Sequence, residues 1–164
     1  MPGAQRTLFR QYHIGGCSSC GFKPEETLAD ICERNNGLDP LAVIEVLQKG
    51  HEADELLMVD PSELKEWLEE RPDKVKLLDV RTREEFEATR IERSELMSQN
   101  TLRDILTGWP RENAIVVVDH LGERCLDGAA YFLGQGFTNV RCLRGGLDAW
   151  SVQIDPKVRR YRLS

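Results

Sequence analysis

The sequence lacks any apolar run approaching the roughly 20 residues that a membrane-spanning helix needs. It also lacks an apolar stretch in residues 1–6, where a secretory signal would begin to build its hydrophobic region. We therefore expect a protein without a membrane anchor or a secretory signal.

Positive charge is also in short supply, because 22 Lys and Arg residues stand against 28 Asp and Glu residues, giving a net charge of −6. An acidic chain is a poor default binder of nucleic acid, so no nucleic-acid partner is expected. The five cysteines are an odd number, which favours a reducing, cytoplasmic setting over a framework of structural disulfides. The hydrophobic fraction of 40% is nevertheless large enough to build a core, which excludes a disordered chain.

The first 50 residues are predicted to form a small helical module that carries a Cys17-x-x-Cys20 motif. A helix is expected to start near Pro24, and a second one at Asp39-Pro40, ending at Gly50. Residues 51–54 are the expected joint to a second domain over residues 55–164. Two cysteines at this spacing can close a disulfide, share a persulfide, supply two metal ligands or serve only structure.

From residue 56 onward, short apolar segments alternate with amphipathic ones, which predicts an α/β domain with a parallel sheet flanked by helices. The expected strands are residues 56–59, 75–80, 95–97, 114–118 and 140–143. The expected helices are residues 61–70, 83–88, 101–106, 124–133 and 147–151.

The junction after the most apolar strand, residues 119–125, is the strongest candidate for a binding site. Ligands of open α/β sheets bind where strands end and helices begin. A tight loop there directs backbone N–H groups inward beside a helix N-terminus, which favours an anion or a thiolate.

The chain from about residue 56 to residue 161 resembles a rhodanese domain, the single-domain sulfurtransferase fold. The segment 77–81 with Glu84-Glu85-Phe86 is similar to the first signature of that family, and residues 136–140 with 143–150 are similar to its terminal signature. The N-terminal module is similar to small helical modules of suspected disulfide- or iron–sulfur-associated proteins. The resemblance implies a sulfurtransferase fold for the larger domain.

The same resemblance singles out the position of the sulfur-carrying nucleophile. The family's loop runs Cys-x-x-Gly-x-Arg-Ser, and counting back from Gly122 and Arg124 places Asp119 where the family has its cysteine. A carboxylate cannot carry a persulfide. In this respect the domain resembles the catalytically inert domains of tandem rhodaneses, where aspartate often takes this position. The loop equivalents are Asp119, His120, Leu121, Gly122, Glu123 and Arg124.

Three thiols are candidate reactive groups: Cys125, Cys17 and Cys20. Cys125 follows the loop near a helix N-terminus, a setting that can lower a thiol pKa, so it is a small packing residue, a displaced sulfur acceptor or a regulatory thiol. Cys142 falls within a strand and is expected in the core. For a metal, His13 or Cys32 would have to join Cys17 and Cys20.

The functional prediction is a sulfur- or redox-handling or binding module without ordinary thiosulfate sulfurtransferase activity. The alternatives are a sulfurtransferase acting through Cys125 or the Cys17/Cys20 pair, and a regulatory interaction domain. A sulfane-sulfur donor or a thiol protein is the expected partner. No cofactor is expected, with zinc or an iron–sulfur cluster at Cys17 and Cys20 as the alternative.

Three further features are expected to have no direct part in the chemistry. Asp79 and Arg81 are expected to form a buried ion pair that fixes the loop after a core strand. His120 is expected to be a solvated loop residue, and the basic segment 159–162 a solvated tail.

Overall fold

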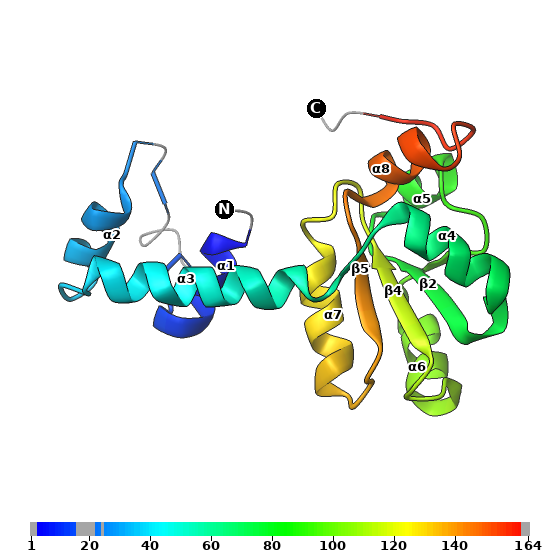
Figure 1. The fold of residues 1–164 in the computed structure, drawn as a ribbon, viewed down its shortest axis with the longest axis horizontal. Helices are drawn as coiled ribbons and strands as arrows, with labels where there is room; N and C mark the ends of the chain where they lie inside the picture. The colour runs from blue at the N-terminus through cyan, green and yellow to red at the C-terminus, as the bar shows by residue number, and fades with distance from the viewer. Residues whose placement is uncertain (1–2, 16–21, 24, 162–164) are drawn as a thin grey trace. The chain divides into compact units, whose positions relative to one another are not determined.

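The computed structural model describes residues 3–15, 22–23 and 25–161 of the 164-residue chain, and it divides into two compact units, Met1–Leu56 and Leu57–Ser164 (Figure 1). Each unit has its own hydrophobic core. No helix within the described residues is long and apolar enough to cross a membrane.

The described part of the N-terminal unit contains three helices, α1 (Ala4–Tyr12), α2 (Leu28–Arg34) and α3 (Pro40–Glu55). Their apolar faces enclose a small core of Leu8, Ile14, Ile31, Cys32, Val43 and Leu47. Helix α1 was not predicted. Helix α2 begins at Leu28 rather than near Pro24, because Thr27 and Asp30 form a reciprocal capping box that fixes the start.

Gly50 does not end the third helix as predicted, because α3 continues through it to Glu55. The residues expected to form the joint, 51–54, are therefore helical. A Cβ atom at Gly50 would lie 2.7 Å from Oγ1 of Thr7 in α1. The missing side chain thus permits close packing of two helices. From local sequence alone, a glycine at such a contact cannot be distinguished from a glycine that ends a helix.

The C-terminal unit is built on five parallel strands in the order β1-β5-β4-β2-β3. The strands are β1 (Met58–Val59), β2 (Val75–Asp79), β3 (Glu95–Leu96), β4 (Ala114–Val118) and β5 (Val140–Leu143). The helices are α4 (Pro61–Glu70), α5 (Arg83–Ala88), α6 (Gln99–Gly108), α7 (Cys125–Gly134) and α8 (Gly146–Gln153), with a 3₁₀ turn at Pro72–Lys74. This confirms the predicted α/β fold.

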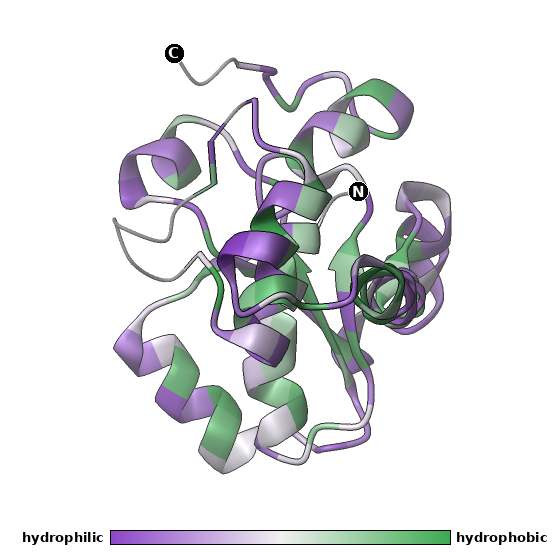
Figure 2. Ribbon diagram, turned by 90° about the vertical axis from the view of Figure 1, so that its left-hand side faces the viewer, coloured by the Kyte–Doolittle hydropathy of each residue, from purple (hydrophilic) through white to green (hydrophobic). Residues whose placement is uncertain are grey.

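The sheet is covered on both faces by two hydrophobic cores, and much of its central part is green, that is hydrophobic, in Figure 2. Every residue of β4 is buried, and its side chains alternate between the two cores. Val116 and Val118 face the core that contains residues of α4 and α8, whereas Ile115 and Val117 face that of α6 and α7. This central strand therefore delivers the loop that follows it to the carboxyl edge of the sheet.

Candidate functional site

The loop of residues 119–124 connects β4 to α7 and is organised around the Asp119 carboxylate. Oδ1 accepts a hydrogen bond from the backbone N–H of Gly122 at 2.6 Å. Oδ2 accepts from the N–H groups of Glu123 at 3.0 Å and Arg124 at 2.6 Å. Asp119 is 2% exposed, so its own carboxylate fills the cradle that an external anion would otherwise occupy.

The turn at Gly145 and Gly146 holds the loop in place. The backbone N–H of Leu147 donates to the carbonyl of Asp119 at 2.8 Å, and that of Asp148 donates to the carbonyl of His120 at 3.1 Å. Gly146 has a φ of 58°, and a Cβ atom there would lie 2.5 Å from the Asp119 carbonyl oxygen. Gly146 thus lets the terminal signature approach the loop closely enough for backbone contacts.

His120 is not the solvated side chain that was expected. Its half-buried ring lies against Tyr161, with ring centroids 4.2 Å apart, and its Nδ1 is buried without a hydrogen-bond partner within the described part of the chain. Among the remaining loop residues, Glu123 and Arg124 are exposed, and Leu121 is 50% exposed. The loop therefore presents one apolar and two charged side chains to solvent.

The buried pair of Asp79 and Arg81 lies at the end of the neighbouring strand. Arg81 donates from Nε and Nη2 to the Asp79 carboxylate, the shortest distance being 2.7 Å, and both side chains are almost completely buried. The Nη1 of Arg81 donates to the Tyr161 hydroxyl at 2.9 Å, and that hydroxyl donates to Glu85 at 2.6 Å. The ion pair was predicted, but its extension through Tyr161 was not.

The C-terminal segment 159–161 is held against the domain, contrary to the expectation of a solvated tail. The backbone N–H of Arg159 donates to Oγ1 of Thr89 at 3.0 Å. Arg160 donates twice to the Asp148 carboxylate, at 2.6 and 3.0 Å. No local pattern marks Tyr161 as a partner of Arg81, because 80 residues separate them. Arg162 lies outside the described residues.

The cysteines fall into two groups. Cys125 and Cys142 are both fully buried in the same core, and a hydrogen bond with Cys142, burial and the nearby charge of Asp119 all raise the pKa of the Cys125 thiol. A helix N-terminus can lower a thiol pKa, but here the pKa of Cys125 is raised, since desolvation opposes the thiolate. Cys17 and Cys20 lie outside the described residues.

Within the part of the chain that the structure describes, no group of three or more metal-ligating side chains is found. Cys32 is 1% exposed in the core of the N-terminal unit, where it packs with apolar neighbours. A ligand set that uses Cys32 would therefore require this core to rearrange.

The parallel sheet, the loop after β4 and the terminal glycine turn together define a family. The family model of the rhodanese-like domain matches residues 60–153, more than half of the chain, and the protein belongs to this family. This confirms the resemblance for the C-terminal unit. The relation of the N-terminal module to other proteins stays a prediction.

Two curated relatives are sulfurtransferases by name. Thiosulfate sulfurtransferase GlpE of Pseudomonas syringae pv. syringae is 32% identical over 74 residues, which cover 45% of this chain and 70% of the relative. The probable adenylyltransferase/sulfurtransferase MoeZ of Mycobacterium tuberculosis is 28% identical over 105 residues, 63% of this chain but 26% of that larger protein. These matches link the C-terminal unit to sulfur-related function.

The solved structures agree with this assignment. A rhodanese-like domain protein from Staphylococcus aureus superposes with a TM-score of 0.50 at 26% identity, covering 64% of this chain and 98% of that one. The CoADR-RHD protein of Bacillus anthracis superposes with a TM-score of 0.51 at 23% identity over 20% of its own length, which supports the fold alone.

Proposed function

We propose that this protein is a cytoplasmic sulfur- or redox-handling module whose rhodanese-like domain lacks ordinary thiosulfate sulfurtransferase activity. The observation that carries the proposal is the Asp119 carboxylate at the centre of the loop, with both oxygens accepting backbone N–H groups. By the spacing to Gly122 and Arg124, Asp119 takes the position of the family's nucleophilic cysteine. Its partner in this proposal is a sulfane-sulfur donor or a thiol protein.

The chemical reason is that a carboxylate oxygen cannot take up sulfane sulfur as a thiolate does. Asp119 is also buried, and its oxygens are already engaged by the loop, so it is a poor nucleophile toward any substrate. The remainder of the loop retains the backbone donors that would stabilise a thiolate at the same position. In this proposal the domain keeps the binding geometry of the family and lacks the sulfur carrier.

The reactive thiols in this proposal are Cys17 and Cys20, at a spacing that permits an easily reduced disulfide or a shared persulfide. The three cysteines that the structure describes are buried, and burial with the nearby Asp39 raises the pKa of Cys32. We expect Cys17 and Cys20 to be alkylated faster at neutral pH than these three. Peptide mapping after timed alkylation measures the order, and equal rates for all five thiols would contradict the assignment.

The alternative of sulfur transfer through Cys125 requires this buried thiol to become accessible and ionised, against a raised pKa. Intact-mass measurement after incubation with a sulfane-sulfur donor separates the possibilities. One added sulfur atom mapped to Cys17 or Cys20 supports the proposal. A sulfur atom mapped to Cys125 favours the alternative, and its absence from every cysteine favours a regulatory interaction domain.

The decisive test of the loop is Asp119→Cys, assayed for thiosulfate:cyanide sulfurtransferase turnover. We expect at least about a hundredfold rise over the unmodified protein, since losing a nucleophile costs some enzymes on the order of 10⁶ in kcat. Asp119→Ser is the matched control, because it has a similar size and no sulfur, and it should stay at background. Robust turnover by the unmodified protein that survives loss of Cys125, Cys17 and Cys20 would refute the proposal.

A further inference from the structure

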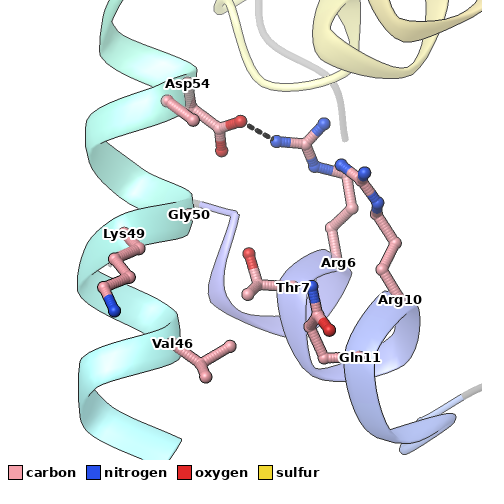
Figure 3. Close-up of a pocket in the computed structure, with 9 residues that line it drawn as sticks. Arg6, Thr7, Arg10, Gln11, Val46, Lys49, Gly50 and Asp54 are labelled. Carbon is pink, nitrogen blue, oxygen red and sulfur yellow. Dashed lines mark hydrogen bonds and ion pairs between the residues drawn. The ribbon is translucent and has the colours of Figure 1, made fainter.

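A pocket of about 320 Å³ lies between α1 and α3, entirely within the N-terminal unit (Figure 3). Helix α1 lines it with Arg6, Arg10 and Gln11, and helix α3 lines it with Lys49 and Asp54. Figure 3 shows both arginine side chains extending from α1 toward the Asp54 end of the pocket. The pocket is far in sequence from the loop after β4 and has no part in the function proposed above.

The charges around this pocket do not balance. The Asp54 carboxylate is hydrogen-bonded to Arg6 and is largely buried, and among the described residues it is the single acidic side chain in the lining. Lys49 forms an ion pair with Glu45 at 2.7 Å, but both side chains are about two-thirds exposed or more, so solvent screens the pair. Among the described residues Arg10 is in no ion pair. Arg10 is therefore the cation of the lining that no carboxylate of the described residues compensates, in a chain whose net charge is −6.

The two arginines also repel one another. Arg6 and Arg10 are four residues apart on α1, where side chains of like charge are neighbours and destabilise the helix. Helix α1 contains no acidic residue that would offset them. Asp54 compensates Arg6 and holds its guanidinium in place, which leaves the positive charge of Arg10 beside it without a counter-charge. A bound anion would relieve this repulsion.

The walls of the pocket are fixed by helix packing. The absence of a side chain at Gly50 lets α3 approach Thr7 of α1 closely, since a Cβ atom there would meet Thr7 at 2.7 Å. The apolar side chain of Val46 lines the same cavity. A preformed cavity of this volume, lined mainly by polar and charged side chains, can accept a small polar ligand.

We propose that this pocket binds a tetrahedral oxyanion group, held mainly by the Arg10 guanidinium with the Gln11 amide and Lys49 in support. The planar guanidinium can donate two parallel hydrogen bonds to such a group, and its uncompensated positive charge favours an anion. A phosphoryl group and a sulfur oxyanion such as thiosulfate share this chemistry. The Arg6–Asp54 ion pair lies beside the Arg10 guanidinium and does not have to break when the anion binds.

The test is an NMR titration of the full chain with inorganic phosphate and, separately, with thiosulfate, at neutral pH and at constant ionic strength set by chloride. We expect saturable shifts of the backbone signals of Thr7, Arg10, Gln11 and Gly50 that fit one isotherm. The anion that saturates the shifts at the lower concentration shows whether the pocket prefers a phosphoryl group or a sulfur oxyanion. Unsaturable drift with both anions, or shifts confined to the C-terminal unit, would overturn the proposal.

Arg10→Gln is the variant that tests the assigned donor, and it should weaken binding by about tenfold or more, as expected for loss of charge-assisted hydrogen bonds. Arg103→Gln is the matched control, because Arg103 is an exposed arginine on α6 and the variant loses the same charge. Equal weakening in both variants would show nonspecific attraction and overturn the proposal. Because Arg10 is exposed, its variant should keep the spectrum of a folded protein.

Discussion

Two buried aspartates stand at the carboxyl ends of neighbouring parallel strands, and their charges are compensated in different ways. Asp79, the last residue of β2, is 0% exposed and is paired with the Arg81 guanidinium. Asp119, directly after β4, is 2% exposed and is surrounded by three backbone N–H groups of its own loop. One carboxylate thus depends on a side-chain cation and the other on oriented backbone dipoles.

The difference determines what can disturb each site. Arg81 is itself held by Tyr161 and by the carbonyl of Thr89, so the charge balance of Asp79 depends on side chains and on distant segments. The donors to Asp119 are main-chain groups, which no substitution of a neighbouring side chain removes directly. The side-chain network of Asp79 fixes the fold around β2. The loop around Asp119 is instead a preformed anion cradle, and the residue at position 119 decides whether the protein's own carboxylate fills it.

The largest expected effect comes from removing the cation that compensates Asp79. Arg81→Met leaves a buried carboxylate without its partner, and we expect unfolding to become easier by about 3–5 kcal/mol. Arg83→Met is the matched control, because Arg83 forms a 3.9 Å exposed pair with Glu87 and its loss should cost well under about 1 kcal/mol. Urea denaturation measures both. A similar loss of unfolding free energy in both variants would mean that the buried Asp79–Arg81 pair contributes no more to stability than an exposed pair.

The next effect concerns the cradle at Asp119. Asp119→Ala frees the N–H groups of Gly122, Glu123 and Arg124, and we expect sulfate or thiosulfate to bind about tenfold more tightly than to the unmodified protein, where the carboxylate repels them. Calorimetric titration measures the affinities. Asp104→Ala, which removes an exposed carboxylate from α6, controls for net charge. Equal affinity in all three proteins would argue against a formed cradle.

A smaller effect is expected from the outer part of the Asp79 network. Tyr161→Phe removes the hydroxyl that accepts from Arg81 and donates to Glu85, and should cost about 1 kcal/mol of stability at neutral pH. Tyr131→Phe is the control, since the Tyr131 ring contacts Phe132 and no hydrogen bond of its hydroxyl is found among the described residues. If thermal unfolding shows no difference between the variants, the hydroxyl network contributes nothing.

The same pair of variants has a defined pH dependence. Burial tends to raise the pKa of Glu85, but hydrogen bonds from Tyr161 and Thr82 outweigh it, so the pKa lies below its ordinary value of 4.5. A lowered folded-state pKa contributes stability that is present above the unfolded value and is lost as pH falls through the folded value. The deficit of Tyr161→Phe should therefore shrink as the pH falls below 4.5. A deficit that grows on acidification would contradict this assignment.

Local sequence was sufficient for much of the larger unit. The apolar segments 75–79 and 114–118 and the glycine turn at 145–146 marked strands and a turn where the structure has them, because their signals come from adjacent residues. The junction between the apolar segment 114–118 and the helix expected after it likewise placed a tight loop after the central strand. Periodicity and turn chemistry are local properties and need no knowledge of the fold.

Tertiary structure decided what the sequence could not. Gly50 lies inside a helix, where it allows close packing against Thr7, and Tyr161 contacts Arg81 and His120 across a long separation in sequence. The pKa of Cys125 is raised because its thiol is buried beside Cys142, although its position at the start of α7 suggested the opposite. Each of these outcomes depends on which residues the packed core brings together, and close approach and desolvation arise only once distant segments meet.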